Sequence, residues 1–186
     1  AAVTIVFNTF AVFFMTASGI ASATAVRVGI AFGEQDFRNI NVAGWTGWLV
    51  QAAVLLVPTL MMLFTPQVFA RIYSDDPALI ALAIPLYVLG GFSLLLDTSQ
   101  TLWSNALRAR HDKWFATASH LLAYIGRLIP LSWYLAFELG HRGAGLFEAL
   151  IVASIVSVSA LTARFMWLSA GDKKRHALSS VVEKTT

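Results

Sequence analysis

The chain has 186 residues, of which 58% are hydrophobic and only 12% are Asp, Glu, Lys or Arg. Soluble globular domains usually carry about 25% charged residues, so this composition, with a mean hydropathy of +0.70, predicts an all-α integral membrane protein. The formal net charge is +3, but the basic residues lie between apolar runs and do not form the basic face of a nucleic-acid-binding protein. No cysteine is present, which excludes disulfides, cysteine-zinc sites and thiol catalysis.

Five apolar runs are long enough to cross a membrane, because a helix needs about 20 mainly apolar residues to span a hydrocarbon core of about 30 Å. In chain order, transmembrane helices are predicted at about 1–25, 44–64, 78–107, 114–137 and 143–167. A polar hinge is predicted at 33–41 and a loop with turn residues at 65–77. Residues 1–170 are therefore expected to form one transmembrane bundle, and 171–186 a basic cytoplasmic tail.

The positions of Lys and Arg predict the orientation of these helices. With five spans, one side of the membrane holds all of the 13 Lys and Arg residues except Arg71, Arg127 and Arg142, and Arg127 falls inside the fourth span. Because basic residues accumulate on the cytoplasmic side, the C-terminus is expected inside and Ala1 outside. The chain starts within an apolar run, without Met or a basic lead-in, so we expect a fragment of a longer protein. A mature protein processed at that point is the alternative.

Several predicted helices carry polar residues at intervals of three, four or seven, which places them on one face. The third span has the clearest such stripe, Ser93, Asp97, Gln100, Thr101 and Ser104, followed by the fourth with Thr117, His120, Tyr124, Arg127 and Tyr134, and more weakly the first with Thr4, Asn8 and Ser22. Polar side chains are costly inside a bilayer. We therefore expect a bundle around a wet cavity, lined by Ser93, Gln100, Thr101, Asn8, His120, Tyr124 and Arg127.

Asp97 is the strongest candidate for a functional residue. It lies about 16 Å before Arg108 along the helix axis, near the middle of the bilayer, where a carboxylate costs about 2.5–3.5 kcal/mol. Such a group would hold a proton or a cation and release it when water enters, as a cation-coupled transporter requires. The alternatives are a static hydrogen-bond network and an ion pair with Arg127, whose predicted height differs by only about 5 Å. Arg127 could instead bind carbonyl groups freed by Pro130.

Motifs typical of enzymes are not found. The four histidines lack the spacing of a metal site, and the sequence contains no HExxH, GxGxxG, phosphate-binding loop or GxSxG pattern. His120 is therefore expected to be a hydrogen-bonded polar group rather than a metal ligand. The chain is predicted not to be an enzyme and to need no cofactor.

Three segments resemble the C-terminal part of transporters of the MATE (multidrug and toxic compound extrusion) family. They are SGIASATAVRVGIAFGEQD at 18–36, LLLDTSQTLWSNALRARHD at 94–112 and YIGRLIPLSWYLAF at 124–137, with a weaker fourth match in the closing RF at 164–165. The second segment is the most specific, because it combines an intramembrane Asp and a Gln with the LR-x-x-x-D turn that follows.

The resemblance implies a twelve-helix transporter of two six-helix lobes, in which the five spans form most of one lobe. It also implies antiport of small-molecule organic cations or drugs against Na⁺ or H⁺, in a bacterial inner membrane, together with the missing N-terminal lobe of the same polypeptide. The acidic residue of the family's coupling-ion site falls on Asp97, with Na⁺ as one candidate ion, and Gln100 is its neighbour. Ser93 replaces the Tyr of some Na⁺-coupled members, which weakens the assignment to Na⁺.

Two other functions remain open at this stage. A related flippase for lipids or lipid-linked saccharides would share the lobe architecture, but it would line its cavity with more cationic residues than Arg127 and His120 supply. A membrane scaffold without transport activity would use the polar stripes only to hold its helices together.

Overall fold

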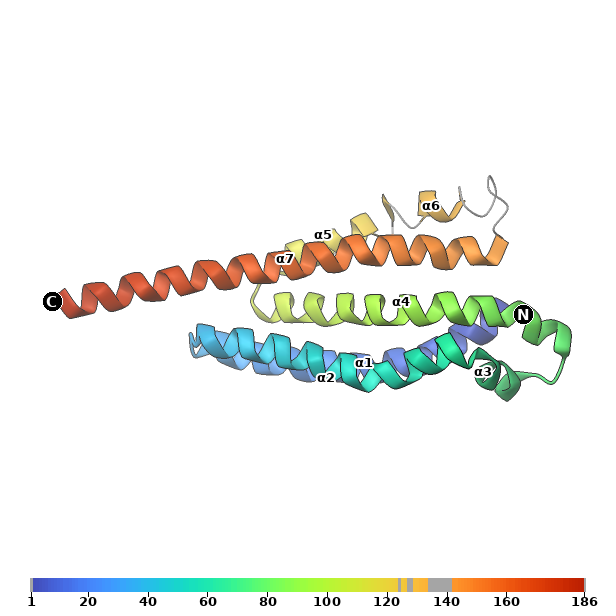
Figure 1. Cartoon of the computed structure of the whole chain (residues 1–186). Coiled ribbons are helices and arrows are strands. Elements are labelled where there is room, and N and C mark those ends of the chain that lie inside the picture. The colour runs from blue at the N-terminus through green and yellow to red at the C-terminus, as the bar shows by residue number, and fades with distance from the viewer. Residues whose placement is uncertain (1, 124, 127–128, 134–141, 186) are drawn as a thin grey trace.

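The computed structural model describes residues 2–123, 125–126, 129–133 and 142–185, and these residues are mainly helical (Figure 1). The helices are α1 (Ala2–Gly33), α2 (Phe37–Phe64), α3 (Pro66–Tyr73), α4 (Pro77–Ala109), α5 (Lys113–Ala123), α6 (Ile129–Trp133) and α7 (Arg142–Thr185). α1 and α2 pack side by side on one face of α4, and α7 packs on the other. Among the residues that the structure describes, four stretches are long and apolar enough to span a membrane: α1, α2, α4 and the part of α7 at Glu148–Asp172.

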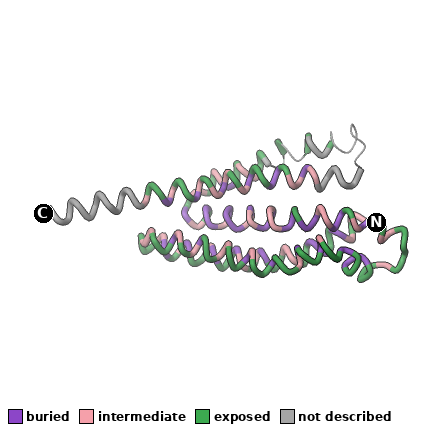
Figure 2. Tube along the Cα trace, viewed as in Figure 1, coloured by how far each residue is buried: buried purple, intermediate pink, exposed green. Residues whose placement is uncertain are grey.

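α4 is the central helix of the bundle. It is buried along most of its length, whereas α1, α2 and α7 expose one face each (Figure 2). Its two ends contribute to separate apolar clusters, one around Trp103 and Phe165 and the other around Tyr87 and Phe69. The stripe of the third predicted span is therefore internal, as expected, but leucines on the opposite face, such as Leu94 and Leu102, are buried as well.

The connections are shorter and more helical than predicted. The polar hinge expected at 33–41 is reduced to 34–36, because α1 continues through Gly33 and α2 begins at Phe37. Asp36 caps α2 by accepting a hydrogen bond from the backbone N of Asn39 at 3.0 Å. Ile40 is fully buried, so the first turn of α2 packs inward while its polar residues face out.

The loop predicted at 65–77 is wrong in its first part, which forms α3. Pro66 occupies the first turn of this helix, where a missing N–H costs nothing. Phe69 and Ala70 are buried while Gln67 and Arg71 are exposed, so an amphipathic pattern over two turns stabilises a short helix that reading for turn residues missed.

The fourth predicted span, 114–137, is only partly described. It contains α5 and α6, while Tyr124, Arg127 and 134–137 lie outside the described residues. The predicted tail continues the fifth span without a break, because α7 runs from Arg142 to Thr185 and extends beyond the other helices (Figure 1).

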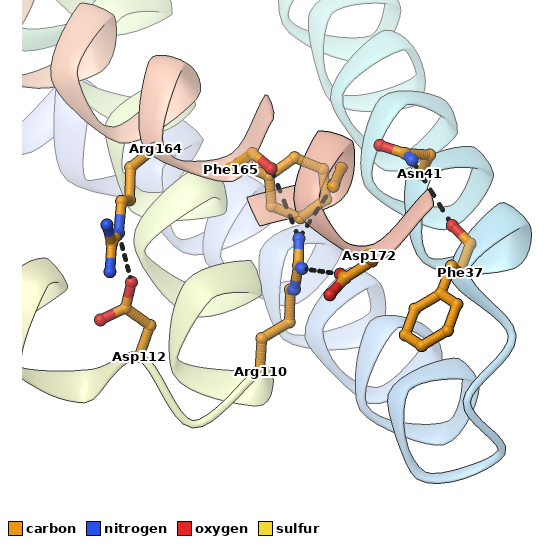
Figure 3. Close-up of polar contacts among 8 residues, drawn as sticks. Phe37, Asn41, Arg110, Asp112, Arg164, Phe165 and Asp172 are labelled. Atoms are coloured by element: carbon orange, nitrogen blue, oxygen red, sulfur yellow. Dashed lines mark hydrogen bonds and ion pairs between the residues drawn. The ribbon is translucent and has the colours of Figure 1, made fainter. Parts of the chain in front are cut away.

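Two ion pairs connect α7 to the turn between α4 and α5 (Figure 3). Arg110 pairs with Asp172 and also donates to Ser169 Oγ at 3.0 Å, and its side chain is 2% exposed. Arg164 donates its Nε to Asp112 Oδ2 at 2.7 Å, with side chains 31% and 17% exposed. Each element thus supplies one cation and one anion. We refer to these four charged residues as the α7 clamp.

The electrostatics of the buried pair follow from its position. Burial lowers the pKa of the Arg110 guanidinium, while the carboxylates of Asp172 and Asp112 act in the opposite direction. Arg110 stays charged under these influences, because a guanidinium is the most basic side-chain group in proteins. The turn itself is held by a left-handed His111, with φ of 63°, and by the hydrogen bond from Asp112 N to Leu107 O at 3.0 Å.

α1 and α2 are in close contact at Gly47. A Cβ on Gly47 would lie 2.8 Å from Thr24 Cβ and closer still to the Thr24 hydroxyl, which is held by a 2.8 Å hydrogen bond to Ile20 O. Small residues at such crossings let membrane helices pack tightly. The site has no room for even one additional methyl group.

We therefore expect Gly47→Ala to destabilise the protein by about 1–3 kcal/mol, the usual cost of overpacking a filled interface. The measurement is the thermal unfolding midpoint in detergent. Gly19→Ala is the matched control, because nothing lies within 4 Å of a Cβ at Gly19; it should leave the midpoint unchanged or raise it. Adding Thr24→Ala to Gly47→Ala should recover part of the loss, and a Gly47→Ala midpoint equal to wild type would contradict the steric explanation.

Candidate functional site

Asp97 lies on α4 at the base of a groove formed with α1. The groove is a cavity of about 280 Å³ lined by Phe7, Phe10, Ala11, Phe14, Met15 and Asp97, and we refer to it as the Asp97 groove. Asp97 is 8% exposed, whereas Met15 at the outer edge is 76% exposed. The carboxylate-bearing residue is thus nearly buried, and the other residues of the groove are apolar.

The groove owes its shape to the regular spacing of aromatic residues on α1. Phe7, Phe10 and Phe14 are three and four residues apart, so they lie along one side of that helix, and the rings of Phe10 and Phe14 stack with their centroids 6.4 Å apart. This spacing of aromatic residues is present in the sequence, but the site was predicted from polar residues alone. An apolar aromatic wall facing an acid suits a hydrophobic or organic cation better than an anion.

The hydroxyl groups on either side of Asp97 are used by the backbone of α4. Ser93 Oγ donates to Leu89 O at 3.0 Å, and Thr101 Oγ1 donates to Asp97 O at 3.1 Å. Thr98 likewise donates to Leu94 O at 2.6 Å. The hydroxyl protons of Ser93 and Thr101 are therefore used in hydrogen bonds within α4. Only the lone pairs of the two hydroxyl oxygens remain available to a ligand.

Two residues of the polar stripe on α4, Gln100 and Ser104, are hydrogen-bonded to α5. The His120 ring lies between Gln100 and Ser104, with Gln100 Nε2 at 2.8 Å from Nδ1 and Ser104 Oγ at 2.9 Å from Nε2. If the amide nitrogen donates, Nδ1 accepts and Nε2 carries the ring proton. This geometry agrees with the expectation that His120 is a hydrogen-bonded polar group. Gln100 and His120 therefore connect helices and do not line the Asp97 groove.

The remaining predicted site residues are not brought together by the described structure. Asn8 is on the exposed side of α1, although it is close in sequence to the groove residues Phe7 and Phe10. Tyr124 and Arg127 lie outside the described residues, so the proposed pairing of Asp97 with Arg127 stays a prediction. Within the described parts of the chain, no group of three or more His, Cys, Asp or Glu residues could hold a metal ion.

The comparisons with known proteins agree on one family. The MatE family model matches residues 1–134. The probable multidrug resistance protein NorM of Caulobacter vibrioides is 37% identical over 174 residues, covering 94% of this chain and 37% of that protein. The protein of the same description from Mesorhizobium japonicum is 28% identical over 158 residues, covering 82% of this chain and 34% of that protein. The chain thus spans about a third of the length of these relatives.

Solved structures show the same fold. The crystal structure of the eukaryotic MATE transporter AtDTX14 superimposes with a TM-score of 0.81 at 19% sequence identity, over 94% of this chain and 40% of that one. An inward-facing MATE family transporter of the MOP superfamily superimposes with a TM-score of 0.71 at 18% identity, over 91% of this chain and 40% of that one. The match of the family model over most of the chain, the apolar helices and the shared fold lead to one conclusion: this chain is an integral membrane protein of the MATE transporter family.

Proposed function

We propose that the chain forms most of one lobe of a multidrug exporter of the inner membrane, in which Asp97 binds the coupling cation, Na⁺ or H⁺. The complete polypeptide would exchange this cation for a small organic cation or drug, and the other lobe would complete the pathway. The relatives named as multidrug resistance proteins support this proposal. Family membership also supports the expectation that the chain is not an enzyme.

The observation that carries the proposal is the position of Asp97. Asp97 is 8% exposed and lines a groove together with the aromatic residues of α1, where a cation or a proton could neutralise its carboxylate. The carboxylate would then alternate between an ion-bound and a free form, and each form favours a different arrangement of the lobes.

The same groove argues against the flippase alternative. Phosphate-linked lipids or saccharides need cationic residues to bind their anionic groups, and the Asp97 groove contains an acid and five apolar residues. Organic cations with apolar rings match both the charge and the aromatic surface.

The test uses the complete polypeptide in inverted membrane vesicles, with ethidium added to the medium as a fluorescent organic cation, because the cytoplasmic face of the protein then faces the medium and export appears as uptake. Either a Na⁺ gradient or a pH gradient is imposed, and the rate of ethidium movement is compared with vesicles that lack the protein. We expect one of the two gradients to drive movement that collapses when that gradient is dissipated by an ionophore. Movement that is insensitive to both gradients, or equal to that of empty vesicles, would contradict an ion-coupled exporter.

A further inference from the structure

A second cavity lies between the end of α1 and the start of α2, away from Asp97. It has a volume of about 390 Å³, and the residues that line it include Arg27, Ile30, Glu34, Asn39 and Val42; we refer to it as the Arg27 pocket. We propose that the Arg27 pocket binds the headgroup of a zwitterionic phospholipid with a primary amine, that is, a phosphatidylethanolamine. This inference does not depend on the ion or drug specificity of the transporter.

The level of the pocket in the membrane follows from its helices. α1 and α2 are both membrane-spanning candidates, and Arg27 and Glu34 lie at the end of α1 next to the turn at 34–36. Residues at the end of a spanning helix lie at the depth of lipid headgroups. The pocket therefore faces headgroups rather than acyl chains or bulk water.

The order of the charges matches such a headgroup. Arg27 and Glu34 are seven residues apart, so they share a face of the helix and Arg27 lies about 10 Å deeper. An arginine at this depth extends its side chain outward to the interface, which brings the guanidinium closer to the level of the Glu34 carboxylate. In phosphatidylethanolamine the phosphate is likewise nearer the acyl chains and the ammonium is further out.

The charged groups of the pocket are available for a ligand. Neither Arg27 nor Glu34 forms an ion pair with any residue that the structure describes, and both are exposed. Asn39 donates its side-chain nitrogen to Asp36 at 2.6 Å, so its side-chain oxygen is the atom left to accept a hydrogen bond from an ammonium. The pocket thus offers donors for a phosphate and acceptors for an amine.

Apolar residues flank the same pocket. Ile30 and Val42 are 57% and 52% exposed, one on each helix, so the glycerol and upper acyl chain of a lipid would cover them as the headgroup binds. A choline headgroup has no N–H to donate to Glu34 or Asn39, and an anionic headgroup would leave Glu34 unpaired and repelled. The interaction of the headgroup with Glu34 therefore differs among the three lipid classes and is enough to distinguish them.

The experiment measures lipid retention by native mass spectrometry of the complete protein, released from micelles that contain equal amounts of phosphatidylethanolamine, phosphatidylcholine and phosphatidylglycerol with identical acyl chains. We expect wild type to retain phosphatidylethanolamine about fivefold better than phosphatidylcholine, the ratio given by one charge-assisted hydrogen bond at an exposed site. Glu34→Gln should abolish that preference, and Arg27→Gln should weaken retention of all three lipids.

Matched variants exclude general charge effects. Arg38→Gln removes the same charge from an exposed position at the same end of the bundle that does not line the pocket, and it should leave retention unchanged. Arg27→Glu combined with Glu34→Arg keeps the net charge but reverses the order of the charges, so it should not restore the preference. Gel-filtration profiles and thermal midpoints of all variants should match wild type, because the substituted residues are exposed.

Three results would overturn the proposal: equal retention of phosphatidylethanolamine and phosphatidylcholine by wild type, a loss in Arg38→Gln as large as in Arg27→Gln, or restored preference in the charge-reversed double variant. Asp97→Asn should retain lipids as wild type does, so a failure of the coupling site and a failure of the lipid site give different results.

Discussion

Asp97→Asn in the complete transporter is expected to reduce strongly the dependence of drug export on the ion gradient. The amide keeps the size of the side chain but cannot carry the charge that a proton or Na⁺ neutralises. Coupling free energies between two ligands are typically about 1–3 kcal/mol, so the gradient-driven component should fall by about five- to 150-fold. The measurement is ethidium movement in inverted vesicles with and without the gradient, normalised to the amount of protein.

Two variants show whether the charge is the cause. Asp97→Glu keeps a titratable carboxylate and should preserve part of the coupling. Thr98→Val removes a neighbouring buried hydroxyl that bonds only to backbone carbonyls of α4 and does not line the groove, so its gradient dependence should equal that of wild type. Unchanged coupling in Asp97→Asn would reject the role proposed for this residue, even if the chain is part of an exporter.

Much of the fold could be predicted because a bilayer leaves few structures for an apolar chain. The lengths of the apolar runs located α1, α2, α4 and the membrane-spanning part of α7. The same criterion cannot detect short amphipathic helices, and it missed α3, a helix of two turns that buries Phe69 and Ala70. The residues at which α1 ends (Gly33) and α2 begins (Phe37) were also not predicted. Asp36 caps α2, so the polar residues that follow it belong to this helix and not to a hinge.

The site was predictable in part for a related reason. Helical periodicity places Ser93, Asp97, Gln100 and Ser104 on one face, and the structure shows that Gln100 and Ser104 both contact His120 on α5. Periodicity does not say which helix packs against which part of that face. Asp97 lines the groove with the aromatic residues of α1, whereas Gln100 and Ser104 contact α5. One polar stripe thus contributes to a groove and to a contact between helices at different positions along α4.

The α7 clamp was not predicted, because its partners are more than 50 residues apart and charges at helix ends usually suggest only topology. The sequence placed Arg110 among the basic residues of the cytoplasmic side and Asp172 in the basic tail, and it indicated no partner for either. In the structure, the Arg110 side chain is 2% exposed and donates to Ser169 and Phe165 O as well as to Asp172. Its guanidinium also lies 5.2 Å from the centre of the Phe165 ring, so one side chain connects the end of α4 to about two turns of α7.

Arg110→Met is therefore expected to be the most destabilising substitution at this end of the bundle. Removing one partner of a buried ion pair costs about 3–5 kcal/mol, and we expect about 2–4 kcal/mol here because the Asp172 side chain is 18% exposed and can be partly hydrated. The measurement is the thermal midpoint of the complete protein in detergent, followed by tryptophan fluorescence. Trp103 is a suitable reporter, because its ring lies 4.9 Å from that of Phe165.

The second ion pair of the clamp provides the matched control. Arg164 and Asp112 are more exposed, so Arg164→Met should cost only about 0.5–1 kcal/mol, although Arg164 also contacts the rings of Phe115 and Trp167. Adding Asp172→Leu to Arg110→Met should raise the midpoint again, because the double variant leaves no buried charge without a partner. Equal midpoints for Arg110→Met and Arg164→Met, or no recovery in the double variant, would mean that burial of the charge is not what makes Arg110 important.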